Sequence, residues 1–96
     1  IEEKCDVVVC LSHLGYAYKD EQRPSDLVLA ANTENIDLVI GGHTHTFLDK
    51  PTIVKNLDGK EVLVNQVGCY GINLGRIDFY FDNDKSKIAN GKSIVV

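Results

Sequence analysis

The chain has 96 residues and a formal net charge of −4; 44% of its residues are hydrophobic and 25% are charged. This length and composition suit one small globular domain, and the lack of a Lys- and Arg-rich run argues against a nucleic-acid polymer as the partner. No apolar run approaches the roughly 18 residues of a membrane-spanning helix, so a membrane span is not expected.

A β-branched run lies near the start of the chain. Residues 6–11 read DVVVCL, and this pattern predicts a strand buried on both faces, as in a parallel sheet covered by helices. After a polar loop, residues 23–35 favour a helix. Ser25 is its expected N-cap, Asp26 suits the positive end of the helix dipole, and residues 32–35 form a frayed end. Its inward face is expected to carry Leu27, Ala30 and Ala31.

A second apolar run, IDLVI at residues 36–40, ends at Gly41 and Gly42. It predicts another buried strand. The order strand, helix, strand indicates one βαβ unit with parallel strands and a right-handed crossover. The two glycines are expected to let the backbone turn sharply and pass close to a ligand.

The second half of the chain predicts antiparallel hairpins. Asp58-Gly59 lies between two apolar segments, which is a strong hairpin signal. Residues 75–82, GRIDFYFD, alternate between apolar and polar side chains, as in a half-buried antiparallel strand. Turns are expected at residues 82–85 and at Asn90-Gly91. The predicted fold class is therefore α/β (α+β), with one βαβ unit followed by antiparallel β-hairpins.

All three histidines of the chain follow predicted strands: His13 the first strand, His43 and His45 the second. Ligands of open α/β sheets bind beyond the carboxyl ends of the parallel strands, and in an extended segment residues i and i+2 point the same way. We therefore expect the three imidazoles at one sheet edge, where they suit divalent ions such as Zn, Mn and Fe.

The histidines and cysteines also allow other interpretations. A single histidine in a loop is commonly a solvated polar residue. A nucleophilic Cys10 assisted by His13 is disfavoured, because Cys10 lies within the strand and no electropositive neighbour would activate its thiol. The three cysteines do not form a disulfide pattern, and Cys5 and Cys10 are expected to be buried as small apolar side chains.

Two stretches form a specific combination: LSHLG at residues 11–15 and DLVIGGHTH at residues 37–45, supported by VNQVGCYGINLGRIDFYFD at residues 64–82. Together they resemble the calcineurin-like metallophosphoesterases, in particular the branch of 5′-nucleotidases and 2′,3′-cyclic-nucleotide phosphodiesterases. The resemblance covers residues 1–82, which is nearly the whole chain.

This resemblance implies a hydrolase of nucleotide phosphate esters, active in nucleotide catabolism, whose domain is a four-layer β-sandwich with helices outside. It implies two divalent metal ions (Zn, Mn, Fe or Co), with His13 and His43 on one ion and His45 on the other. It also suggests periplasmic, secreted or cell-surface localisation, which the chain itself does not reveal. The substrate stays open among phosphate esters such as nucleotides and UDP-sugars, and no substrate-binding residue is assigned.

The chain lacks the family's D-x-H, G-D-x-x-D and G-N-H-[DE] motifs. Two nearby cations repel each other unless anionic ligands lie between them, and three neutral imidazoles cannot supply these. We therefore expect residues 1–96 to be a single fragment, the C-terminal portion of a metallophosphoesterase domain, with no catalytic residue and little activity alone. The alternative is a non-catalytic metal-binding or interaction module in which His13, His43 and His45 hold one zinc ion.

A fragment of a larger sandwich would expose a strand edge and an apolar sheet face. Such surfaces favour pairing with another copy of the chain, so self-association is expected.

Overall fold

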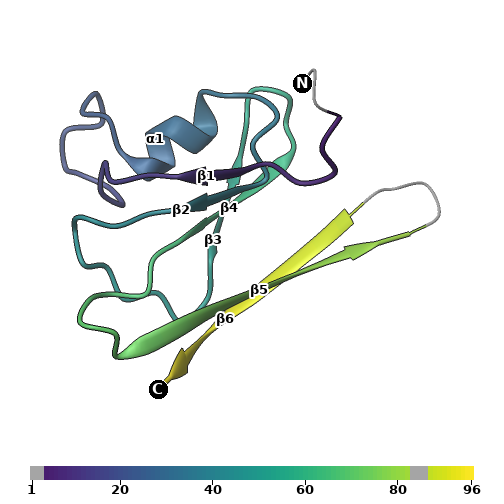
Figure 1. The fold of residues 1–96 in the computed structure, drawn as a ribbon. Helices are drawn as coiled ribbons and strands as arrows, with labels where there is room; N and C mark the ends of the chain where they lie inside the picture. Colours follow the sequence, from purple (N-terminus) through teal and green to yellow (C-terminus); the bar gives the residue numbers. More distant parts are fainter. Residues whose placement is uncertain (1–3, 83–86) are drawn as a thin grey trace.

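The chain folds into a four-stranded mixed sheet, one short helix and a two-stranded ribbon (Figure 1). The computed structural model describes residues 4–82 and 87–96. The elements of the first part are β1 Val9–Leu11, α1 Asp26–Ala31, β2 Leu38–Ile40, β3 Thr52–Lys55 and β4 Glu61–Asn65. The strand order in the sheet is β1-β2-β4-β3. Neighbouring strands are parallel from β1 through β2 to β4, and β3 is antiparallel to β4. The predicted α/β (α+β) class is confirmed.

The predicted βαβ unit is present, with Val9 of β1 opposite Leu38 of β2 in a parallel pair. The helix begins where expected, because Ser25 Oγ accepts a hydrogen bond from the Val28 N–H at 3.2 Å. The helix ends at Ala31, before the predicted frayed end at residues 32–35, and the side-chain amide of its C-cap, Asn32, donates to the Val28 carbonyl at 2.9 Å. Such a side-chain bond offers the backbone an alternative to another helical turn.

The hydrophobic core lies between α1 and one face of the sheet. Its fully buried members come from the helix and the two central strands: Ala30, Val39, Val62 and Val64. Leu27, one turn before Ala30, packs against them as predicted. The core therefore fixes β2 and β4 under the helix, and these strands in turn fix the loops that leave their ends.

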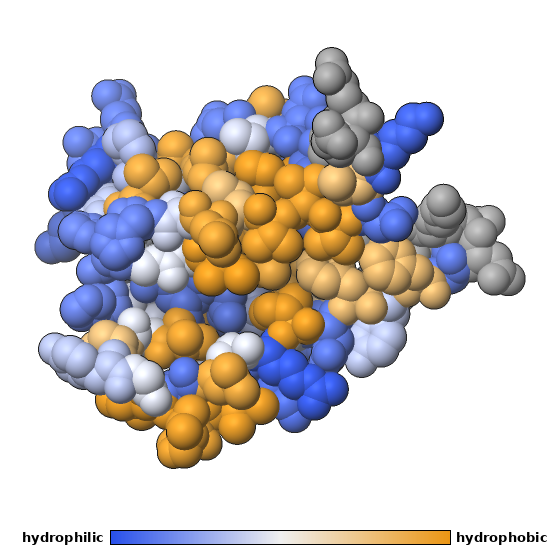
Figure 2. Space-filling model, viewed as in Figure 1, coloured by the Kyte–Doolittle hydropathy of each residue, from blue (hydrophilic) through white to orange (hydrophobic). Residues whose placement is uncertain are grey.

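The opposite face of the sheet is covered only in its centre. Leu38 and Leu63 are 4% and 6% exposed there, whereas Val9 is 46% and Leu11 is 80% exposed. The prediction that the first strand is buried on both faces is therefore wrong, because the described residues place nothing over the outer end of β1. Figure 2 shows apolar side chains gathered across the strands in one view.

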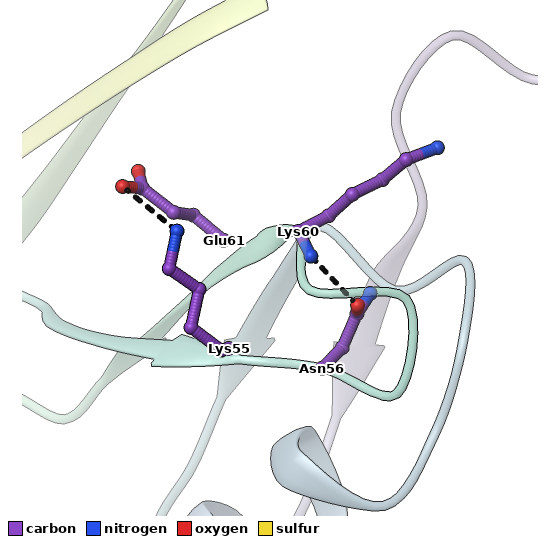
Figure 3. A network of polar contacts seen from close by, with 4 residues as sticks. All are labelled: Lys55, Asn56, Lys60 and Glu61. Atoms are coloured by element: carbon purple, nitrogen blue, oxygen red, sulfur yellow. Dashed lines mark hydrogen bonds and ion pairs between the residues drawn. The ribbon is translucent and has the colours of Figure 1, made fainter.

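The hairpin predicted at Asp58-Gly59 joins β3 to β4 (Figure 3). The side-chain oxygen of Asn56 accepts hydrogen bonds from the Asp58 N–H at 2.9 Å and the Lys60 N–H at 3.0 Å, which closes the turn. Gly59 has a φ of +74°, a left-handed conformation that glycine adopts without steric cost. The hairpin fixes β4, the strand that precedes Gln66.

Strands β5 (Asn73–Phe81) and β6 (Lys87–Val95) form an antiparallel ribbon that crosses beside the sheet (Figure 1). The turn predicted at Asn90-Gly91 is wrong, because both residues lie within β6. A Cβ on Gly91 would stand 2.6 Å from Ile77 Cδ1 and 2.7 Å from Pro51 Cγ, so this glycine serves close packing. The turn predicted at residues 82–85 lies, beyond Asp82, outside the described residues.

The three cysteines are free. Cys10 is partly buried and packs against the core, as expected. Cys5 is exposed, so the expectation that it is buried is wrong, because it lies before the regular part of β1. Within the part of the chain that the structure describes, no helix is long and apolar enough to cross a membrane.

Candidate functional site

His13 and His43 meet beyond the carboxyl ends of β1 and β2, at the sheet edge that the sequence indicates. The Ser12 N–H donates to the Ile40 carbonyl at 2.9 Å, which continues the parallel pairing past the last strand residues. The two imidazole rings then lie edge to face, with centroids 5.2 Å apart and planes at 65°. Both side chains are exposed, so their nitrogens are accessible to a ligand from solvent.

The two glycines after β2 create the space for this arrangement. A Cβ on Gly42 would stand 3.1 Å from His13 Nδ1, and a Cβ on Gly41 would overlap the carboxylate of Asp26. Neither glycine has a positive φ. These glycines therefore let the His13 ring and the Asp26 carboxylate approach the backbone without using a positive φ, and the predicted close approach to a ligand stays a prediction.

The backbone is left-handed at both histidines that follow the glycines. The φ angles of His43 and His45 are 71° and 52°, so the expectation of an extended segment is wrong. The Thr44 N–H donates to the Gly42 carbonyl at 2.9 Å, which makes His43 the centre of a γ-turn, a rare turn when φ is positive. Each such conformation costs about 1–3 kcal/mol, and strain of this kind concentrates at functional sites.

Exposed and inward side chains alternate along this loop. His43 and His45 are exposed, whereas Thr44 and Thr46 are partly buried and their Oγ1 atoms are 2.8 Å apart. Thr44 Oγ1 also accepts a hydrogen bond from the Tyr16 N–H at 3.0 Å, which ties the loop to the segment after His13. The threonines thus anchor the loop while the histidines face solvent.

Within the described residues, His45 does not join the other two histidines in a group of ligands that could hold one ion. Its ring lies edge to face with the ring of Tyr70, with centroids 6.2 Å apart and planes at 62°. Tyr70 has a φ of 65° and is, like the two loop histidines, a non-glycine residue in the left-handed region. Because the Tyr70 ring is next to the His45 ring, the segment of residues 68–71 lies beside the histidine loop.

The pair of histidines fits as part of a metal site. Two imidazole nitrogens at about 2.1 Å from one tetrahedral ion place their ring centroids roughly 5 Å apart, and the rings of His13 and His43 are 5.2 Å apart. The three predicted ligands do not form one complete group. Among residues 4–82 and 87–96, no three His, Cys, Asp or Glu side chains lie together so that they can hold an ion.

Sequence reasoning missed two buried polar residues behind the histidine loops. Gln66 is 2% exposed and Asp26 is 0% exposed. From the sequence, Asp26 is expected only to interact with the dipole of α1. Gln66 occurs in a motif of the resemblance but has no role assigned to it. The available signal for Gln66 is a pair of polar residues, Asn65 and Gln66, between the apolar run of β4 and Val67, because buried polar groups require partners.

No protein-family model matches the chain. The chain is 40% identical over 92 residues to the trifunctional nucleotide phosphoesterase protein YfkN of Bacillus subtilis, a match that covers 96% of this chain and 6% of that protein. It is 31% identical over 94 residues to a snake venom 5′-nucleotidase of Gloydius brevicauda, a match that covers 84% of this chain and 15% of that protein. The chain thus spans only a small part of the length of these relatives.

A solved structure has the same fold over almost the whole chain. The 5′-nucleotidase precursor from Thermus thermophilus superposes with a TM-score of 0.80 and 32% sequence identity, over 98% of this chain and 20% of that one. Both the sequence and the arrangement of strands therefore agree with the resemblance that LSHLG and GGHTH indicate.

Proposed function

Because this chain belongs to the family of 5′-nucleotidases and related nucleotide phosphoesterases, we propose that it contributes to a metal-dependent site that hydrolyses nucleotide phosphate esters. One observation carries this proposal: the rings of His13 and His43 lie 5.2 Å apart at the carboxyl edge of the parallel strands. Nucleotides and related phosphate esters are the proposed substrates.

In this proposal His13 and His43 bind one divalent ion through their imidazole nitrogens, and His45 binds a second. The lack of a three-ligand group among the described residues, and the place of the His45 ring beside Tyr70, support this division. Zn, Mn, Fe or Co suit such nitrogen ligands. Ions held there would supply Lewis-acid chemistry, which polarises a phosphate ester and acidifies a water molecule.

The residues of this chain hold and orient the ions, and the carboxylates that must lie between two cations come from outside residues 1–96. Two points support this division: neutral imidazoles do not offset the repulsion of two neighbouring cations, and no Asp or Glu among the described residues joins two of the histidines in a group that could hold an ion. We therefore propose that the chain is the C-terminal portion of a metallophosphoesterase domain and is inactive by itself.

The alternative of a module that holds one zinc ion with all three histidines is not favoured. Such a site requires three nitrogens around one point, and the described residues contain no group of three potential ligands that can hold an ion. The separate positions of the His13–His43 pair and of His45 suit two ions better than one.

We also propose that the protein acts outside the cytoplasm. One relative is named as a venom enzyme and the matched structure is named as a precursor. Fractionation of the source cells, with an antibody against this chain, tests the proposal. Recovery of the protein in the cytoplasm alone would contradict it.

Metal-dependent phosphate release is the direct test of the activity. The natural protein that carries this chain is stripped of metal with a chelator and supplied with Zn²⁺, Mn²⁺ or Co²⁺ and a nucleoside 5′-monophosphate. We expect phosphate release only with metal, strong loss of activity in His43→Ala, and no activity from residues 1–96 alone. Full activity of the stripped protein, or of His43→Ala, would overturn the proposal.

A further inference from the structure

Gln66 connects the two ends of the loop that carries His43 and His45. Its Nε2 donates to the Gly42 carbonyl at 2.8 Å, and its Oε1 accepts from the Thr46 N–H at 2.9 Å. These two backbone groups flank the strained pair of histidines on either side. A carboxamide is the side chain that provides a donor and an acceptor on neighbouring atoms, so one buried glutamine closes the loop.

Asp26 and Ser12 hold the other histidine loop. The Ser12 hydroxyl donates to Asp26 Oδ1 at 2.6 Å, and the same hydroxyl oxygen accepts from the Leu14 N–H at 3.2 Å. Ser12 and Leu14 are the two neighbours of His13 in the chain. The carboxylate at the start of α1 thus fixes the backbone on both sides of His13.

The two anchors meet in the interior. Gln66 Nε2 lies 3.5 Å from Asp26 Oδ2 and 3.2 Å from Thr44 Oγ1. The first distance is at the long limit of a hydrogen bond, so the shorter bonds to the loops carry most of the interaction. Both residues are almost fully buried, and in such surroundings a partly satisfied polar group is costly. Ser12, Asp26 and Gln66 are called the anchor network below.

The geometry points to the anchor network as the set of positioning residues that hold His13 against His43 for metal binding, an inference that rests on the proposed function. The network makes its bonds next to the histidines in the chain and does not touch their rings in any described hydrogen bond. Its position resembles that of outer partners that orient metal ligands, whose loss lowers metal affinity about 10- to 100-fold.

If the anchor network had a purely structural role, its loss would lower the stability of the metal-free protein at least as much as the metal affinity. The left-handed φ angles of His43 and His45 store strain that the loop would relax if its ends were free. Loss of the Gln66 bonds would therefore move the imidazoles while the valine core of the sheet stays in place. Metal affinity should fall more than the resistance of the metal-free protein to unfolding.

The test measures Co²⁺ binding to the natural protein that carries this chain, with Co²⁺ alone as the probe. Its visible spectrum reports coordination, and competition with a chelator gives the affinity. The variants are Gln66→Met and Ser12→Ala, with Gln22→Met as the matched control because Gln22 is exposed in the loop before α1. Ser12→Thr keeps the hydroxyl and serves as the conservative rescue. Urea unfolding without metal is recorded for each.

We expect Gln66→Met and Ser12→Ala to lower Co²⁺ affinity about 10-fold or more and to change the spectrum. Gln22→Met and Ser12→Thr should stay within about 2-fold of wild type. If Gln66→Met does not fold, the Ser12→Ala and Ser12→Thr pair decides, since Ser12 is only partly buried.

Wild-type affinity and spectrum in Ser12→Ala, or in a folded Gln66→Met, would overturn the inference while leaving the proposed function intact. Loss of affinity no greater than the loss of metal-free stability would also overturn it. Failure of the wild-type protein to bind Co²⁺ would overturn the proposed function, and this inference with it.

Discussion

The carboxylate of Asp26, at the start of α1, occupies the space in which residue 41 would carry a Cβ, so Gly41 packs directly against it. The helix and the loop after β2 are thereby in contact without any intervening side chain. The same carboxylate accepts a hydrogen bond from the hydroxyl of Ser12, which lies in the loop after β1. One buried acid therefore joins the helix to the loops that carry His13 and His43.

Gly41→Ala should destabilise the protein by about 1–3 kcal/mol, because an added methyl group in a packed interior forces its neighbours to move. Asp26→Ser should be destabilising too, since it removes the partner of Ser12. The double variant should be less destabilised than the sum of the two, because the shorter serine leaves room for the methyl group. Urea unfolding of all four proteins measures this coupling, and strict additivity would contradict the contact.

A second prediction concerns the ion that His13 and His43 are proposed to share. Two ligands of one ion lose their contributions together, so His13→Ala and His43→Ala should be strongly non-additive in their effect on metal affinity. Titration calorimetry of the natural protein with Zn²⁺ gives the affinities of the two single variants and the double variant. Additive losses would show that the two imidazoles do not bind the same ion.

His45→Ala provides the matched control for this cycle. His45 lies in the same loop as His43, but its ring is next to Tyr70, whereas the His43 ring is next to His13. Combined with His13→Ala, it should give nearly additive losses if it serves a second ion. Coupling as strong as that between His13 and His43 would instead favour one site built from all three histidines.

The strands and the pairing of His13 with His43 were predictable from the sequence. Apolar runs ending at residues 11 and 40 predict parallel strands, and parallel strands bring the residues after their carboxyl ends to one edge. The structure places the His13 and His43 rings there, in contact. Periodicity and topology suffice for this result because they fix where each strand ends.

The local conformation of the site was not predictable in the same way. A pattern of alternating residues favours an extended segment, but tertiary bonds from Gln66 accompany left-handed backbone at His43 and His45. Gly91 shows the same limit, because its close contacts with Ile77 come from another strand. Neither constraint is local in sequence, so neither propensity nor turn statistics contains it.

The N-cap of α1 gives a third prediction, on stability alone. Ser25 is 2% exposed and its hydroxyl oxygen accepts the Val28 N–H. Ser25→Ala leaves that donor without this partner and should lower the free energy of unfolding by about 1 kcal/mol. Ser25→Asp, which keeps an acceptor, should retain more stability, although its larger side chain must fit a buried position. Urea unfolding monitored by circular dichroism measures both, and an unchanged midpoint in Ser25→Ala would contradict the capping role.

The last prediction concerns the exposed outer end of β1, on the sheet face opposite α1. Leu11 is 80% exposed at the end of β1, and β1 pairs only with β2 within the described sheet, so apolar surface and an open strand edge coincide. Residues 1–96 alone should therefore associate with a second copy at micromolar concentration. Leu11→Lys should shift the mass measured by light scattering towards that of the monomer, because a charge resists burial in such a contact. Leu57→Lys is the matched control, since Leu57 is 61% exposed but lies in the β3–β4 turn, away from this face. A monomeric mass for the unsubstituted chain, or equal effects of the two substitutions, would contradict association through this face.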